Sequence, residues 1–171
     1  IETIKECVDL GFTSVMIDGS LDYSTKDENG AHPIRSFEDN VAITKEAVEV
    51  AHAAGVSVEG EIGTLGGVED DTVAGGVHLT EPEEAEEFVK QTGVDALAIA
   101  IGTSHGAYKF PVGTEVKLAL DIVNEVHSRC PEISLVMHGS SSVPAHMVEE
   151  VNKYGGKVPN AVGVPTDMIQ D

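Results

Sequence analysis

Two histidines stand where buried strands are expected to end. His105 follows the apolar run 96–101, His138 follows the run 133–137, and a glycine comes directly after each histidine. Short apolar runs of this kind are typical of parallel strands that are buried on both faces. In barrels of alternating strands and helices, the carboxyl ends of the strands carry the chemistry. Because neutral imidazole suits zinc, we expect His105 and His138 to ligate one zinc ion.

Two histidines are one short of the three protein ligands that catalytic zinc sites commonly have, so a third ligand would come from outside this chain. Taken alone, a histidine in such a position is more often a hydrogen-bonded loop residue than a metal ligand. The matching contexts of the two, Ser104-His105-Gly and Met137-His138-Gly, favour the shared metal site.

Two carboxylates, Asp18 and Glu61, come at the ends of the predicted strands 13–17 and 56–60. One interpretation is that they orient the ligating imidazoles through the second ring nitrogen. Another is that they hold a second cation, either divalent or monovalent. The third is that they accept hydrogen bonds from the backbone of the turns that come next.

Glu69 is the candidate catalytic residue. It lies in the glycine-rich loop 63–79, within Gly66-Gly-Val-Glu69-Asp-Asp71. Flanking glycines would let such a loop carry a carboxylate over the strand ends, and a glutamate placed there suits proton transfer. A charged surface loop is the alternative.

An anion site is expected beside the second histidine. Gly139-Ser-Ser141-Ser precedes Pro144 at the start of a predicted helix, and backbone N–H groups at a helix start can bind phosphate with the help of hydroxyls. Gly106 and Lys109 could add an amide and an ammonium group. The alternative is an ordinary capped helix start.

The elements that must position these residues alternate regularly. Hydrophobic periodicity, with Ser36 and Pro82 marking two helix starts, predicts strands 13–17, 56–60, 95–101 and 133–137 and helices 2–10, 37–54, 82–92, 115–129 and 144–154. Successive strand–helix units imply right-handed crossovers and a parallel sheet. No Gly-x-Gly-x-x-Gly follows a first strand, and all four strands end in ionisable residues, which favours a TIM (β/α)8 barrel. A full barrel takes about 250 residues, so residues 1–171 would form a single partial domain.

The composition of the chain excludes some classes of binding partner. The 171 residues include 30 acidic and 10 basic ones, for a net charge of −20, and such a surface repels nucleic acid and anionic membranes. No apolar run is long enough to span a membrane. Cys7 and Cys130 have neither metal nor redox spacing, which fits a reducing cytosol. The chain starts and stops within expected helices and has no signal peptide, so we expect an internal fragment of a cytoplasmic protein.

Four segments of the sequence are specific enough to compare with known protein families. They are Val15-Met-Ile-Asp18-Gly-Ser20, Val58-Glu-Gly-Glu61-Ile-Gly-Thr-Leu-Gly-Gly67-Val-Glu69-Asp-Asp71, Gly102-Thr-Ser-His105-Gly-Ala-Tyr-Lys109-Phe and Val136-Met-His138-Gly-Ser-Ser-Ser-Val-Pro144. In this order they resemble the class II, zinc-dependent fructose-bisphosphate aldolases, and the last segment resembles the subtype of Calvin-cycle bacteria. The resemblance covers nearly the whole chain and implies the fourth to seventh strands of a TIM barrel.

The resemblance also implies an activity and residue roles. The activity is reversible cleavage of fructose 1,6-bisphosphate to dihydroxyacetone phosphate and glyceraldehyde 3-phosphate, with zinc polarising the ketone and stabilising the enediolate. His105 and His138 match two zinc ligands, and Glu69 matches a loop glutamate for proton transfer. Asp18 and Glu61 match a second metal position or zinc-site support. The ketose-phosphate site would comprise Gly106, Lys109, Gly139 and Ser141.

By the same resemblance, other parts of the site lie outside the chain. A third zinc histidine and the aspartate that serves the C4 hydroxyl would precede Ile1, and an Asn-x-Asp strand and an arginine for the distal phosphate would follow Asp171. We therefore expect the isolated chain to be inactive, to bind zinc weakly and to self-associate through unpaired strand edges. The full-length protein is expected to be a homo-oligomer. Alternatives are a tagatose-bisphosphate aldolase, a zinc-dependent barrel hydrolase and a non-catalytic binding module.

Overall fold

A four-stranded sheet forms the centre of the computed structural model, which describes residues 1–28, 30–64, 66–69, 72–74, 78–105, 110–111, 117–142, 144–158 and 161–170. Its strands are β1 (Ser14–Ile17), β3 (Ser57–Ile62), β6 (Ala96–Ile99) and β9 (Ser134–Val136). They lie side by side in chain order, and every pairing among them is parallel. The predicted parallel α/β arrangement is confirmed, and it has the strand order that successive units of a barrel produce.

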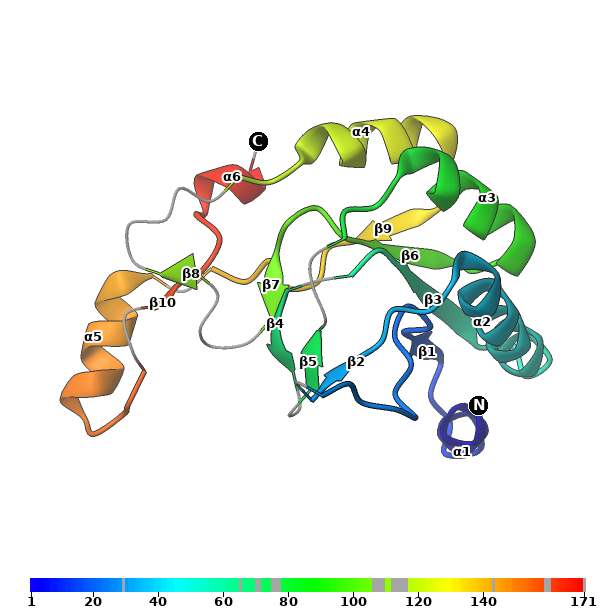
Figure 1. The fold of residues 1–171 in the computed structure, drawn as a ribbon, viewed down its shortest axis with the longest axis horizontal. Coiled ribbons are helices and arrows are strands. Elements are labelled where there is room, and N and C mark those ends of the chain that lie inside the picture. Colours follow the sequence, from blue (N-terminus) through cyan, green and yellow to red (C-terminus); the bar gives the residue numbers. More distant parts are fainter. Residues whose placement is uncertain are drawn as a thin grey trace.

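The expected helices are present as α1 (Glu2–Asp9), α2 (Phe37–His52), α3 (Pro82–Thr92), α4 (Leu120–Arg129) and α5 (Ala145–Lys153), followed by the short α6 (Asp167–Gln170). Figure 1 shows α2, α3 and α4 along one side of the sheet. Two helix starts are explained by local chemistry. Ser36 Oγ accepts the Asp39 N–H at 3.1 Å, and Pro82 occupies the first turn of α3, where an N–H would have no helical partner.

The core lies between the sheet and these helices. Val58 of β3 and Leu97 and Ile99 of β6 are at most 2 % exposed, and they pack with the fully buried Phe88 of α3. Because successive strand residues point to opposite faces, the residues between them project from the other side of the sheet. One face is therefore sealed by helices, and the other can carry polar groups.

Several element boundaries differ from those expected, most of them by one or two residues. β3 continues to Ile62, so Glu61 lies inside the strand and not just behind it, because its pairing with Ala98 is followed by a further pair. β6 ends at Ile99, two residues early. α4 begins at Leu120, whereas the start expected at 115 lies outside the described residues.

Arg129 ties α3 to α4. Its guanidinium contacts Glu83 and, at 3.1 Å, Glu86 of α3, and it also contacts Glu125 of its own helix at 2.9 Å. Lys90 contacts Glu86 as well, and the two cations, Lys90 first and then Arg129, hold the pKa of Glu86 below its usual value. Part of the acidity of these helices is thus compensated locally.

A second four-stranded sheet includes β7 (Ser104–His105), the strand that follows β6 in the chain. Its order is β2 (Ala31–His32), β5 (Thr72–Ala74), β4 (Gly66–Glu69) and β7. β4 and β5 form an antiparallel hairpin, and backbone hydrogen bonds of 2.9 and 3.1 Å between Thr64 and His78 close its neck. The glycine-rich loop expected at 63–79 therefore contains a hairpin, and β4 pairs with the strand that carries His105.

A small antiparallel pair is formed by β8 (Phe110–Pro111) and β10 (Ala161–Val162). Among all the helices within the described ranges, none combines the length and the hydropathy needed to cross a bilayer.

Candidate functional site

Three of the candidate residues, Asp18, Glu61 and His138, share the face of the central sheet that points away from the helices. In β3, Val58 packs into the core, so Glu59 and Glu61 project from the opposite face. Asp18 and His138 each come directly after a residue that packs against the core, and they continue this alternation beyond the ends of β1 and β9. The sheet thereby gathers three carboxylates and an imidazole on one face.

His138 is held by a glutamate from two strands away. Its Nε2 lies 2.7 Å from Glu59 Oε1, and the two side chains are 24 % and 20 % exposed. Because β6 lies between β3 and β9, this contact crosses β6, which presents only the small side chains of Ala96 and Ala98 on that face. The sequence analysis missed Glu59. The signal that could have found it was its spacing of two from Glu61, which puts both carboxylates on one side of a strand.

His105 faces His138 across the site. The ring centroids are 5.6 Å apart and the ring planes are inclined by 72°. The residue after His138 makes this approach possible, because a Cβ on Gly139 would lie 2.7 Å from the Ser104 carbonyl oxygen and its φ is +66°. Only glycine accepts both this contact and this backbone conformation without strain.

The imidazole pair fits part of a zinc site. Tetrahedral zinc with bonds of about 2.0–2.1 Å to nitrogen places two ligating ring centroids about 5 Å apart, close to the separation found here. Metal-ligating histidines commonly use a carboxylate as the partner of the nitrogen that does not bind metal, so with Glu59 at Nε2, Nδ1 is the nitrogen that would be available to a metal ion. Within the described part of the chain, no three His, Cys, Asp or Glu side chains are grouped to hold a metal ion. The described residues therefore offer two imidazole donors and not a complete ligand set.

Asp18 and Glu61 have surroundings that the sequence left open. Asp18 Oδ1 accepts the Ser20 N–H at 2.8 Å and the Ser20 hydroxyl at 2.6 Å, while Tyr23 donates its hydroxyl to Oδ2. Glu61 is 8 % exposed, and its main-chain carbonyl accepts a hydrogen bond from Asn40 Nδ2 at 2.9 Å. The turn-capping interpretation describes the contacts of Asp18, and a metal role for either residue stays a prediction.

Glu69 is the last residue of β4, and it pairs with Thr72 across the hairpin. Two residues earlier, Gly67 is the Cα partner of His105. At about 3.3 Å per strand residue, the Glu69 backbone is roughly 7 Å along the strand from that pairing. The hairpin thus brings the backbone of the proposed proton-transfer residue to the strand of one proposed zinc ligand.

The phosphate-binding candidates are only partly placed. Gly106 and Lys109 lie outside the described residues. Ser141 lies between two serines whose hydroxyls donate to main-chain carbonyls, Ser140 to Met137 at 2.7 Å and Ser142 to Val164 at 2.6 Å. α5 begins after Pro144 without a side-chain cap, so this serine segment does not lead into an ordinary capped helix start.

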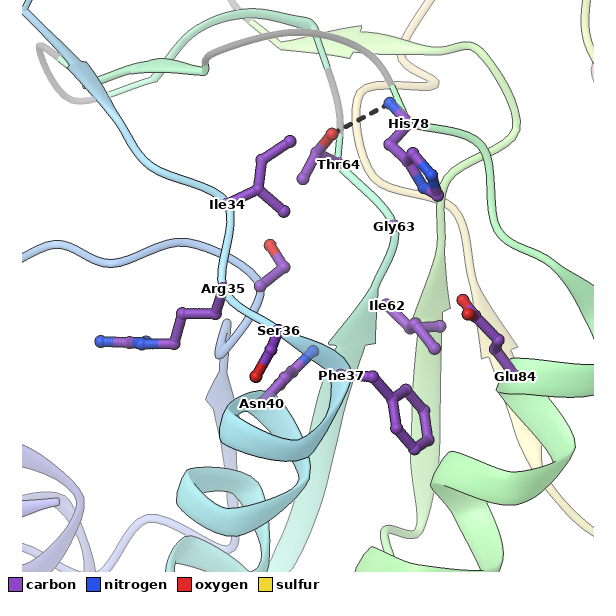
Figure 2. A pocket seen from close by; sticks show the side chains of 11 residues that line it. Ile34, Arg35, Ser36, Phe37, Asn40, Ile62, Gly63, Thr64, His78 and Glu84 are labelled. Carbon is purple, nitrogen blue, oxygen red and sulfur yellow. Dashed lines mark hydrogen bonds between the residues drawn. The ribbon is translucent and has the colours of Figure 1, made fainter. Parts of the chain in front are cut away.

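A pocket of about 220 Å³ lies at the carboxyl end of β3, and its lining does not include His105 or His138. Figure 2 shows side chains from the start of α2, the end of β3 and the start of α3 around this pocket, with the Thr64–His78 contact at its edge. Its lining comprises Ser20, Ile34, Arg35, Ser36, Phe37, Asn40, Ile62, Gly63, Thr64, His78 and Glu84. The sequence analysis did not anticipate this pocket, because its lining comes from four separate segments.

Fold and site together define an α/β protein with a parallel sheet and a histidine pair at the carboxyl ends of its strands. Residues 1–161 match the family model for class II fructose-bisphosphate aldolases, and the chain belongs to this family.

Curated relatives agree with the family model. The chain is 56 % identical to a fructose-bisphosphate aldolase of Giardia intestinalis over 169 residues, which cover 99 % of this chain and 48 % of that protein. It is 49 % identical to a fructose-bisphosphate aldolase of Nostoc commune, with 98 % and 49 % covered. The chain thus spans about half the length of the curated relatives it matches. Relatives of such different origin leave the Calvin-cycle subtype a prediction.

Solved structures share the fold. An aldolase-family structure from Coccidioides immitis has a TM-score of 0.66 at 30 % identity, over 95 % of this chain and 51 % of that one. The YdjI aldolase from Escherichia coli K12 has a TM-score of 0.59 at 33 % identity, over 82 % and 42 % of the two chains.

Proposed function

We propose that the full-length protein containing this chain catalyses reversible cleavage of fructose 1,6-bisphosphate to dihydroxyacetone phosphate and glyceraldehyde 3-phosphate. The observation that carries the proposal is the facing pair His105 and His138 in a chain of the class II aldolase family. Zinc, when bound, supplies a Lewis acid for the ketone carbonyl of the substrate. No lysine of the chain then needs to act as a nucleophile.

Residues of the chain would bind the metal, transfer a proton and bind the substrate phosphate. His105 and His138 hold the metal, and Glu59 keeps the His138 ring in one tautomer and orientation. Glu69, carried by the β4–β5 hairpin, exchanges a proton with the substrate. Asp18 and Glu61 support the zinc site or hold a second cation. The substrate phosphate is bound by Gly106, Lys109, Gly139 and Ser141.

Residues 1–171 would form one partial domain, about four central βα units of a TIM barrel. The remaining strands would supply the third zinc histidine, the aspartate for the C4 hydroxyl and the arginine for the distal phosphate. The substrates and products are phosphorylated ketoses and trioses, and we propose a cytosolic homo-oligomer as the working form.

The test is an assay of the full-length protein on fructose 1,6-bisphosphate and tagatose 1,6-bisphosphate, before and after chelation and after zinc is restored. We expect cleavage of the fructose compound that chelator abolishes and zinc restores. Preference for the tagatose compound would change the substrate, and phosphate release without carbon–carbon cleavage would identify a hydrolase. Cleavage that survives complete metal removal would contradict the proposal.

A second test uses residues 1–171 alone. Unpaired edges at β1 and β9 are expected to make this polypeptide self-associate in sedimentation experiments, with no aldol cleavage and weak zinc binding. A monodisperse, active monomer would show that catalysis needs no residue outside the chain.

A further inference from the structure

Thr103 links the two segments that carry the histidines. Its Oγ1 donates a hydrogen bond to the main-chain carbonyl of His138 at 2.6 Å, and the residue is 1 % exposed. It lies two residues before His105 and 35 residues before His138. We propose that Thr103 is a positioning residue that fixes the separation of the two zinc-binding imidazoles. This inference rests on the proposed function, since it assumes that both histidines bind zinc.

The hydroxyl acts on the backbone from which the His138 ring extends. The acceptor is the carbonyl of the ligand residue itself, so its position determines where the His138 Cα stands. The next residue, Gly139, lies against the backbone of Ser104, where a Cβ would come within 2.7 Å of the carbonyl oxygen. Two consecutive contacts thus hold the His138 segment against residues 103–104, immediately before the other histidine. Any shift between the segments would change the 5.6 Å separation of the rings.

The contact of Glu59 with His138 does not by itself fix the separation of the two imidazoles. Its contact at Nε2 fixes the orientation of the His138 ring, whereas the place of the ring relative to His105 depends on the backbone. A metal site needs both, because ligand atoms must converge on one point before the ion arrives. Thr103 lies in a loop segment between β6 and β7, so no strand pairing of its own performs this task.

The alternative is that the hydroxyl only stabilises the fold, and the chain offers a matched control. Thr92 of α3 is 4 % exposed, and its Oγ1 donates to the Phe88 carbonyl at 2.7 Å. This hydrogen bond has the same chemistry and burial, but it lies among the helices on the other side of the sheet. Thr103→Val and Thr92→Val therefore remove equivalent bonds, and Thr103 alone is connected to a proposed metal ligand.

The experiment measures the zinc dissociation constant of the full-length protein by competition with a chromophoric chelator. Thr103→Val should raise it about 10- to 100-fold, the usual effect of losing a group that orients a metal ligand. Thr92→Val should leave it at the wild-type value, and Thr103→Ser, which keeps the hydroxyl, should restore tight binding. Thermal unfolding of the metal-free proteins should show similar losses for the two valine variants.

The outcomes separate the inference from the proposed function. Equal zinc affinity of Thr103→Val and Thr92→Val, with zinc binding lost in His138→Ala, would overturn the positioning role and leave the metal site standing. Full zinc binding by His138→Ala would overturn the proposed function itself. If Thr103→Val does not fold, Thr103→Ala replaces it, because the space left can admit a water molecule that donates to the carbonyl. Its zinc affinity must then fall between the wild-type and His138→Ala values, and a wild-type value would overturn the proposal.

Discussion

The two ends of the central sheet use the same residue types for different purposes. At the amino ends of the strands, Asp95 Oδ2 accepts the Val58 N–H and contacts His52 Nε2, both at 2.8 Å. At the carboxyl ends, His138 also contacts a carboxylate, Glu59, but a second imidazole, His105, faces it. A histidine–carboxylate pair therefore does not by itself mark a site. The difference is that a backbone N–H also binds the carboxylate of the amino-end pair, whereas the imidazole of the carboxyl-end pair lies against a second imidazole.

The largest expected loss of activity comes from removing either histidine at the carboxyl ends of the strands. In the full-length protein, His105→Ala or His138→Ala should abolish chelator-sensitive cleavage, because too few imidazoles remain to hold a catalytic zinc. His52→Ala, the matched change at the amino end, should keep both zinc and turnover. Metal analysis and a cleavage assay on the three variants provide the measurement. Equal losses in all three would mean that the two ends do not differ in function.

A substitution of Glu69 tests whether the β4–β5 hairpin also contributes a residue to catalysis. Glu69→Gln should slow kcat by about 10²- to 10⁴-fold, the range for a positioned acid–base group, with zinc content and substrate affinity nearly intact. Glu84→Gln changes a carboxylate that lines the pocket at the carboxyl end of β3 and should leave kcat at the wild-type value. Weaker zinc binding, with kcat of the zinc-saturated variant unchanged, would instead make Glu69 a ligand or a structural residue.

The sequence predicts features that depend on local contacts and misses those that depend on residues far apart in the chain. Apolar runs with glycine and proline boundaries predict the strands to within one or two residues and both ends of α3, because burial and capping are local to each element. The alternation of strands and helices predicts the parallel order. Glu59 and Thr103 were missed because their roles depend on neighbours 79 and 35 residues away. Gly139 was assigned to phosphate, while its close contact with Ser104 depends on the approach of two loops. The hairpin at 66–74 was hidden because its pairing partner, β7, is only two residues long.

Glu59 should have an intermediate effect. Glu59→Gln keeps the size of the side chain but removes its charge, so the His138 ring loses a charge-assisted hydrogen bond. We expect the zinc dissociation constant to rise about 10- to 100-fold. Glu46→Gln, on the exposed side of α2, serves as control. If both variants bind zinc like the wild type, the Glu59–His138 contact resembles the amino-end pair and is purely structural.

The amino-end pair should affect only stability, and only slightly. Burial disfavours the charged form of Asp95, but hydrogen bonds from His52 and the Val58 N–H outweigh this effect and hold its pKa below the usual value. The folded state thus prefers the ionised carboxylate. Its contribution is present above the unfolded-state pKa of about 3.9, and it is lost as pH falls through the lower folded-state pKa.

Asp95→Asn in the full-length protein should therefore lower the free energy of unfolding at pH 7 by less than about 1 kcal/mol, because the His52 and Asp95 side chains are 42 % and 45 % exposed and water screens the pair. The difference from wild type should shrink as the pH approaches 3, where the wild-type carboxylate also becomes protonated. Urea unfolding at several pH values measures this, with zinc content followed in parallel. A difference that grows toward acid pH would contradict the ionised pair, and loss of zinc would mean that the two ends of the sheet are coupled.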